Sequence, residues 1–295
     1  MPPEACPFSP KRVLVSKDGI VVLGTDGEIQ QLRDDGTPLN LHRPYPVSIV
    51  AAGLIEGDVV AAWMDHELRV ARIARLDLST HRMGVDRAAV RRDGTMTTHP
   101  DGHRWSHALD AEPMALGVNG GQVALSLWPD GFYVIDGEGR EQWRASIPRG
   151  KDGKPRAVVD LHHNGVRWVL TMRDGSRVAV AEDEVTELEP ERLDDPVVQV
   201  HHGNGGRLVV TSDHVASWVE NDQLVLQAAL SGPVGGVLWS DDQDAWLIAG
   251  WRERVVLRRD GFNRWSGDEV HADVACIDGV AYTIDNRGQW AAYPA

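Results

Sequence analysis

The sequence predicts an all-β fold assembled from one repeated unit, and three observations support this prediction. A short phrase recurs along the chain: a proline or polar residue, a Val-rich strand, and a turn of Gly, Asn or Asp. A second series of turns, most of them Asp-Gly, falls between the strands. No segment carries a capped apolar pattern with the period of about 3.6 residues that a helix requires. Units of this size, built from short strands, cannot bury their apolar faces alone and must stack on one another.

The recurring phrase marks the start of seven repeats, which follow each other at intervals of about 36 to 42 residues with one longer gap. The starts fall near residues 10, 46, 113, 155, 196, 233 and 270. Each repeat predicts four strands, most clearly after Pro233, where the runs VGGVLW, AWLIAG, RVVLRR and FNRWSG are separated by turns. Asp and Gly tolerate the left-handed backbone that tight turns require. We therefore expect one domain over residues 1–295, a β-propeller of seven four-stranded antiparallel blades.

The longer gap, between Pro46 and Pro113, leaves an alternative of eight blades. Either one blade carries an insertion within 66–112, or an extra blade lies in this region. Two blades in this space would each be short for four strands and their turns, so the first option is favoured. Residues 66–76 come closest to a helical pattern, but the alternation in LRVARIA favours a strand.

The two ends of the chain are expected to meet. The final repeat, from about Val270, is one strand short, and the residues before Pro10 have no repeat of their own. An unpaired sheet edge is a liability, so residues 4–8 should lie along the blade that contains Val274 and Tyr282 and close the ring. Prolines in this segment limit the contact to a short edge pairing, because proline lacks the amide donor.

Composition narrows the classes of function. The net charge is −14, from 30 Lys and Arg against 44 Asp and Glu, and this disfavours binding to nucleic acid phosphates. No apolar run approaches the length that a membrane-spanning helix needs, and the N-terminus lacks the apolar region of a secretory signal. The only two cysteines, Cys6 and Cys276, form no metal-binding motif, which fits a reducing compartment. We expect a soluble, cytoplasmic protein without a membrane or nucleic-acid partner.

One motif resembles a known family. In YVIDGEGREQW, the residues Asp136, Gly139 and Trp143 have the spacing D-x-x-G-x-x-x-W, which resembles the repeat of quinoprotein-like propellers. The resemblance implies that the tryptophan docks between neighbouring blades. Shorter versions end at Trp105, Trp265 and Trp290. Quinone-binding members clamp their cofactor with a vicinal cysteine pair, which this chain lacks, so no cofactor is expected.

Two double histidines are the clearest local candidates for binding. His162 and His163 lie in one repeat and His201 and His202 in the next, and the two pairs occupy equivalent positions. Neutral imidazoles are good ligands for transition metals. No third repeat supplies a matching histidine, and a metal site needs three or four ligands. We therefore predict no metal site here and interpret the histidines as polar strand-end residues that line a channel or a turn.

The segment HPDGHRWSH spaces His99, His103 and His107 at intervals of four, which would gather them on one helix face. The Pro-Asp-Gly within it predicts a turn instead, so these side chains should scatter. The chain has no G-x-S-x-G elbow, no phosphate-binding loop and no dinucleotide fingerprint leading into a helix. We assign no catalytic residue.

Eleven tryptophans stand against four tyrosines and three phenylalanines. Most lie in alternating runs and should pack between blades, but Trp128 and Trp239 fall at turns. Exposed tryptophans bordered by polar groups are typical of binding hot spots, so these two are candidate binding residues.

The resulting hypothesis is a non-catalytic scaffold for protein–protein interaction, one component of a multi-protein prokaryotic assembly, with a protein partner. The alternative is a propeller enzyme, or a binder of a small molecule or metal, with its site at the channel mouth and built around the histidine pairs.

Overall fold

Short antiparallel strands make up most of the computed structural model, which describes residues 2–294 except 18, 80–83, 85, 94–96, 183 and 192. The chain divides into two compact units. The first contains Met1–Thr25, Gln30–Leu39 and Leu193–Ala295, and the second contains Asp26–Ile29 and Asn40–Arg192.

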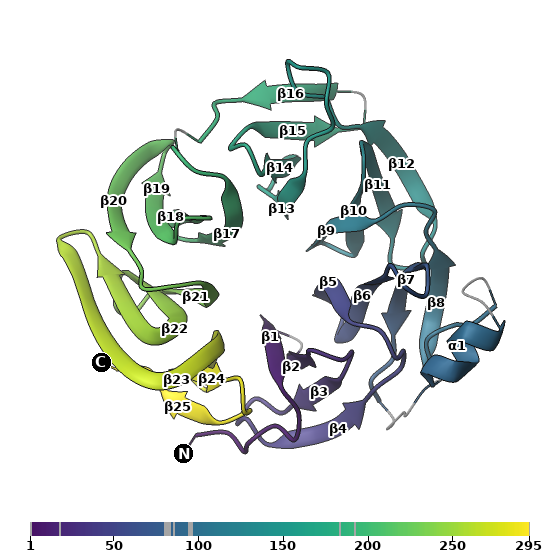
Figure 1. Ribbon diagram of the computed structural model, residues 1–295, viewed down its shortest axis with the longest axis horizontal. Helices are drawn as coiled ribbons and strands as arrows, with labels where there is room; N and C mark the ends of the chain where they lie inside the picture. The colour runs from purple at the N-terminus through teal and green to yellow at the C-terminus, as the bar shows by residue number, and fades with distance from the viewer. Residues whose placement is uncertain are drawn as a thin grey trace. The chain divides into compact units, whose positions relative to one another are not determined.

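In the described part of the chain, five sheets have four strands each, paired in chain order. Figure 1 shows the strands of each sheet side by side. The first contains β1 (Pro10–Ser16), β2 (Gly19–Gly24), β3 (Ile29–Leu32) and β4 (Pro38–His42). The second contains β5 (Ile49–Ile55), β6 (Asp58–Asp65), β7 (Val70–Leu76) and β8 (His103–Ala108). The third contains β9 (Pro113–Asn119), β10 (Gln122–Leu127), β11 (Gly131–Asp136) and β12 (Glu141–Ser146). The fourth contains β13 (Val158–His163), β14 (Trp168–Met172), β15 (Arg177–Ala181) and β16 (Glu184–Leu188). The fifth contains β17 (Val197–Gly203), β18 (Gly206–Thr211), β19 (Val215–Glu220) and β20 (Gln223–Ala229).

The sixth sheet joins the last two sequence repeats. It contains β21 (Val234–Ser240), β22 (Ala245–Arg258), β23 (Gly261–Ile277), β24 (Val280–Asp285) and β25 (Trp290–Ala292). The first part of β23 pairs with β22 and its last part, from His271, pairs with β24.

The prediction of seven blades, with eight as the alternative, is therefore wrong, because the strands of the described residues form six sheets. An expected turn and an expected repeat start are both absent, because strands continue through them. β22 continues through the turn expected at Arg252, whose φ of 57° lies in the left-handed region, and β23 continues through the expected repeat start at Val270. The described residues between Pro46 and Pro113 form a single sheet, β5–β8, where an eighth blade would have needed two.

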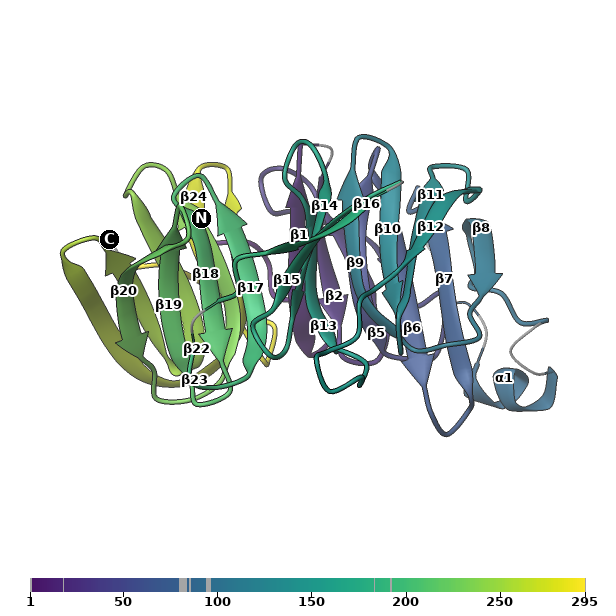
Figure 2. The same ribbon diagram turned by 90° about the horizontal axis from the view of Figure 1, so that it is seen from above.

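A short helix, α1 (Arg87–Asp93), lies in the connection between β7 and β8, where the sequence pattern predicted none. Figures 1 and 2 show it beyond β8, on the side away from β5. Asp86 caps it by accepting a hydrogen bond from the Ala89 amide (2.6 Å), and Arg87 pairs with Asp65 (2.9 Å). Since Val90 is its only buried residue among those described, the apolar period that predicts a helix is absent. The strand predicted within 66–76 is present as β7.

The strand that begins a repeat pairs with the next strand, and this pairing has a register shift near the start of the first of the two strands. It recurs between Ile49 and Ala51, Val158 and Asp160, Val197 and Gln199, Val234 and Gly236, and His271 and Asp273. A bulge of this kind redirects the side chain that follows it. In the first unit, Gln199 donates to the Val234 carbonyl (2.9 Å) and Asp273 accepts from the Val13 amide (2.5 Å). The bulge residue thus bonds to the first strand of the next repeat.

The tryptophans of the D-x-x-G motifs pack where repeats meet. Trp143 packs on the cluster shared by the β9–β12 and β13–β16 sheets, and Trp105 joins the cluster between β5–β8 and β9–β12. Trp265 packs beside Val274 and Tyr293. This is the placement that the resemblance to quinoprotein-like repeats implies.

The N-terminal segment lies along the last repeat, as expected. The Cys6 amide donates to the Gly288 carbonyl (3.0 Å), and the Cys6 side chain is buried in a cluster with Tyr282 and Trp290. The Ser9 hydroxyl donates to the Asn286 carbonyl (3.0 Å). As far as the structure describes the segment, it adds no strand to the sheet, which ends at β25. Cys6 and Cys276 are both free thiols.

Candidate functional site

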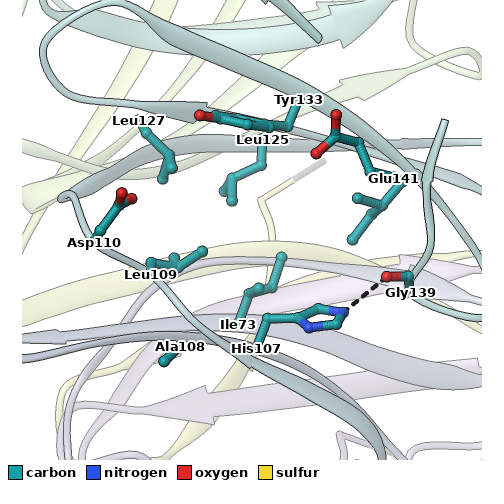
Figure 3. Close-up of a pocket in the computed structure, with 11 residues that line it drawn as sticks. Ile73, His107, Ala108, Leu109, Asp110, Leu125, Leu127, Tyr133, Gly139 and Glu141 are labelled. Atoms are coloured by element: carbon teal, nitrogen blue, oxygen red, sulfur yellow. Dashed lines mark hydrogen bonds between the residues drawn. The ribbon is translucent and has the colours of Figure 1, made fainter. Parts of the chain in front are cut away.

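An apolar crevice lies between the β5–β8 and β9–β12 sheets, within the second unit. Its volume is about 500 Å³. It is lined by Ile73, His107, Ala108, Leu109, Asp110, Leu125, Leu127, Tyr133, Ile135, Gly139 and Glu141. Figure 3 shows Ile73 and Leu109 on one wall facing Leu125 and Leu127 on the other, with Asp110 and Glu141 toward opposite ends.

The first wall comes from β7 and the residues after β8. Ile73 is buried on β7, and its neighbour β8 ends at Ala108. The Leu109 amide then donates to the Ala71 carbonyl (2.8 Å), which continues the pairing for one more residue. Leu109 is therefore held over the crevice while Asp110, the next residue, is exposed.

The second wall comes from alternate residues of two paired strands. Leu125 and Leu127 lie on β10, and Tyr133 and Ile135 lie on β11. Residues two apart in a strand point to the same face, so these four side chains form one apolar surface. Leu125 and Leu127 are buried, whereas Tyr133 is only half-buried and offers its ring to the crevice.

The turn between β11 and β12 closes one side of the crevice. One Asp136 carboxylate oxygen accepts hydrogen bonds from the amides of Glu138 and Arg140, each 2.9 Å long. Gly139 has a φ of 81°, which favours glycine, and a Cβ there would lie 2.7 Å from the Trp105 ring. The spacing of Asp136 and Gly139 in the sequence thus encodes this turn.

Side chains of β7 and β8 hold the turn in place. The Gly137 carbonyl accepts hydrogen bonds from Arg75 Nη1 (3.0 Å) and Trp105 Nε1 (2.8 Å). His107 Nε2 donates to the Gly139 carbonyl (2.8 Å). Because Trp105 and His107 are on alternate positions of β8, both reach the same turn. The two walls of the crevice are therefore fixed relative to one another.

A buried ion pair supports this arrangement. Arg75, only 7% exposed, donates from Nε to Asp58 (2.6 Å) and from Nη2 to Glu56 (3.1 Å). Arg104 also pairs with Asp58 (2.6 Å), and this hydrogen bond raises the pKa of Arg104. Hydrogen bonds between charged groups are stronger than neutral ones. These ion pairs hold the Arg75 side chain, which donates to the Gly137 carbonyl beside the apolar lining of the crevice.

The rim of the crevice is acidic, and one of its carboxylates already holds a cation. Arg144 donates from Nε and Nη2 to the two oxygens of Glu141 (2.6 and 2.8 Å), which raises the pKa of Arg144. Its guanidinium lies over the Tyr133 ring, 5.4 Å from the centroid. Among the described residues, no hydrogen bond or ion pair involves the Asp110 carboxylate.

The first predicted histidine pair is built into β13 and the turn after it. His162 Nδ1 lies 3.0 Å from Asp160 Oδ2 on the same strand. His163 Nδ1 accepts a hydrogen bond from the Gly165 amide (3.1 Å), and its ring meets the Trp168 ring edge-on at 5.0 Å. His163 therefore shapes the β13–β14 turn.

The second pair lies on β17, at the corresponding place. His201 Nε2 lies 3.0 Å from Gln199 Oε1, and His202 is exposed. Each first histidine is thus two residues after the bulge residue of its strand and contacts it. The two pairs belong to different compact units. Their role in binding stays a prediction.

The two predicted tryptophans have different environments. Trp128 is 39% exposed at the end of β10. Trp239 packs edge-on against Trp218 and Trp246, at 5.5 and 5.2 Å, and its Nε1 donates to Asp241 (2.9 Å). Trp128 thus keeps an accessible face, whereas most of the Trp239 ring is in contact with protein. Their binding roles also stay predictions.

The histidines of HPDGHRWSH do not scatter entirely as expected. His99 and His103 stack with their rings 5.0 Å apart and 14° from parallel, and Arg72 Nη1 lies 3.2 Å from His99 Nδ1. Burial, followed by the charge of Arg72, lowers the pKa of His99. His107 points instead to the Gly139 carbonyl and lines the crevice.

The crevice was not predicted from the sequence. Its lining comes from strands and loops of two different sheets, and each leucine fits the pattern of an ordinary core position. The one available signal was the pair Leu109–Asp110 directly after a strand, where an apolar residue meets an exposed carboxylate.

Comparison with known proteins identifies the fold. No protein-family model matches the sequence, and no curated protein does. The WD40 β-propeller domain of Doa1 is similar, with a TM-score of 0.69 and 11% identity over 100% of this chain and 95% of that one. The β-propeller domain of Cps50 (Swd1) from Myceliophteria thermophila has a TM-score of 0.70 and 12% identity over 98% of each chain. The fold is a β-propeller.

A third similar structure, BamB from Moraxella catarrhalis, has a TM-score of 0.60 and 10% identity, covering 96% of this chain and 93% of that one. Identities this low concern the fold of the propeller and not its function. In the described part of the chain, no helix is long and apolar enough to cross a membrane.

Proposed function

We propose that this propeller is a non-catalytic scaffold that binds a protein partner, and that the crevice between the β5–β8 and β9–β12 blades receives an apolar segment of that partner. The observation that carries the proposal is the crevice itself: an apolar space of about 500 Å³ between walls fixed by Arg75, Trp105 and His107. A rigid site loses little conformational entropy when it binds.

The dimensions and lining support this role. Binding sites for compact ligands and side chains have volumes of roughly 300 to 1,000 Å³ and are mostly apolar with a few polar groups. Here Leu109, Leu125, Leu127 and Tyr133 supply the apolar surface. Binding hot spots of this kind have a desolvated apolar centre and a polar rim.

We further propose a place in the cell for this scaffold: one component of a multi-protein prokaryotic assembly, in the cytoplasm, with no nucleic-acid or membrane partner. The net charge of −14 supports the absence of nucleic-acid binding. The repeat is proposed to be of the quinoprotein-like type without its cofactor site, on the D-x-x-G-x-x-x-W spacing that ends at Trp143.

To test this proposal, peptides that bind the purified protein are selected from a random displayed library. Their affinities for the protein are then measured by calorimetry. Leu109→Glu places a charge inside the crevice and should weaken the selected peptides at least tenfold. Val166→Glu is the matched control, because Val166 is 80% exposed and is not part of the crevice lining. Thermal melts establish that both variants fold. If no peptide is selected, or if Leu109→Glu binds like the control, the proposal fails.

A further inference from the structure

The crevice carries its charges at the ends of an apolar channel, and both are negative. Asp110 lies toward one end and Glu141 toward the other, with leucine side chains between them (Figure 3). A ligand that fills the apolar part therefore places its neighbouring groups beside carboxylates. Both carboxylates are exposed, and a cation beside an exposed carboxylate gains a modest attraction that salt weakens.

At the Glu141 end, the chain supplies that cation itself. The Arg144 guanidinium donates to both carboxylate oxygens of Glu141 and lies over the Tyr133 ring. This is the geometry in which a guanidinium is held by a carboxylate and an aromatic face together. The Glu141 end is thus already neutralised by an intramolecular contact.

At the Asp110 end, the described residues provide no such partner. Asp110 is exposed and directly follows Leu109, whose amide is fixed by the Ala71 carbonyl. A cation beside Asp110 would therefore stand next to the apolar side chain that covers Leu109. The overall net charge of −14 also attracts basic segments and repels acidic ones at low salt.

We infer that the crevice, if it binds a partner as proposed above, selects a segment in which a large apolar side chain is followed or preceded within a few residues by Lys or Arg. The apolar side chain fills the space between Leu109 and Leu125, and the cation pairs with Asp110. Glu141 contributes less, because Arg144 occupies it. The partner is thus a basic, apolar stretch of protein.

The peptides from the selection described above provide the probe. Their consensus should contain Lys or Arg close in sequence to a Leu, Met or aromatic anchor. In the tightest peptide, replacement of that basic residue by Gln should weaken binding several-fold and replacement by Glu more than tenfold, with the difference shrinking at high salt. A consensus without a basic residue, or equal affinity of the Lys and Glu peptides, overturns the inference.

Variants of the protein assign the charge recognition to Asp110. Asp110→Asn should remove most of the preference for the Lys peptide over the Gln peptide, measured as the ratio of their dissociation constants. Glu182→Gln is the control, since Glu182 is exposed, is not part of the crevice lining, and its replacement changes the net charge equally. If both variants reduce the preference equally, the selection reflects net charge alone and the inference fails. The proposed function would survive that result, because its own test depends on Leu109→Glu.

Discussion

Two turns with the same internal geometry are used in different ways. In the turn after β11, Asp136 accepts from the amides two and four residues later, and its own amide donates to the Arg140 carbonyl (2.9 Å). In the turn after β24, Asp285 accepts from the amides of Arg287 and Gln289 (2.8 Å each), and its amide donates to the Gln289 carbonyl (3.0 Å).

The neighbours of these turns differ. The first turn receives side chains: Arg75 and Trp105 donate to Gly137, and His107 donates to Gly139. The second turn accepts a hydrogen bond from a backbone group, because the Cys6 amide donates to the Gly288 carbonyl. One junction thus depends on a charged network within the second unit, and the other depends on the N-terminal segment within the first unit.

The local sequence therefore determines the hydrogen bonds within each turn, while the segment packed against the turn determines which contacts the turn makes. Asp and Gly at a fixed spacing produce the same hydrogen bonds in both places. The first turn, which accepts hydrogen bonds from Arg75, Trp105 and His107, borders the crevice. The backbone contact at Gly288 is direct and brings the N-terminal segment against the second turn.

The largest expected effect comes from the charged junction. Arg75→Met should lower the free energy of unfolding by about 4 kcal/mol, because it leaves the buried Asp58 carboxylate without its closest buried cation and Gly137 with one donor fewer. Urea denaturation measures the change. Arg104→Met is the control: Arg104 also pairs with Asp58, but its side chain is 53% exposed, so its loss should cost far less. Equal losses would contradict the role assigned to burial.

The turn glycines should respond unequally to alanine. In Gly288→Ala, the new methyl group meets the Cys6 carbonyl oxygen at a φ of 80°, and we expect a loss of about 3 kcal/mol. In Gly139→Ala the methyl meets the Trp105 ring, a side chain that can shift, so about 2 kcal/mol should be lost. Thermal melts of both variants decide this order. A larger loss for Gly139→Ala would mean that the side-chain junction is the less adaptable one.

A pH dependence at the N-terminal junction should be about as large as the smaller of the two glycine effects. Burial raises the pKa of Asp273 from its usual 3.8 to about 6. The folded state therefore binds this proton more tightly than the unfolded state, so the stability from this group is complete below pH 3.8 and is lost as the pH rises through 6. Relative to Asp273→Asn, the wild-type protein should lose about 2 kcal/mol between about pH 4 and pH 6.5. Denaturation of both proteins across this range measures the difference, and parallel curves would show that Asp273 does not titrate there.

The fold was largely predictable because its strands are local. The phrases that start near 113, 155 and 196 begin β9, β13 and β17 close to the expected places. Alternation in LRVARIA predicted β7. Each of these features depends on residues that are close together in the chain.

The number of blades was not predictable in the same way. It depends on which strands pair, and β22 and β23 continue through positions where the sequence carries turn residues. The left-handed Arg252 bends the chain without ending the strand. Helix α1 was missed because ion pairs with Asp65 and Glu67, rather than an apolar face, hold it in place.

The candidate site was not predictable from the sequence because it is defined by space between sheets. Three of the predicted site residues contact their own strands or neighbouring rings: His162 with Asp160, His201 with Gln199, and Trp239 with Trp246. The residues that line the crevice, such as Leu125 and Tyr133, have the pattern of core residues. Long-range packing alone distinguishes them.

Strand β23 couples the unfolding of the last two sequence repeats. Its 17 residues pair with β22 at one end and with β24 at the other, so two sequence repeats share one covalent backbone element and its hydrogen bonds. Proteins open in cooperative segments that follow such shared pairings. The amides from Val234 to Ala292 should therefore exchange with solvent as a single block, and the last two repeats should behave as one unit in unfolding although the sequence counts them as two.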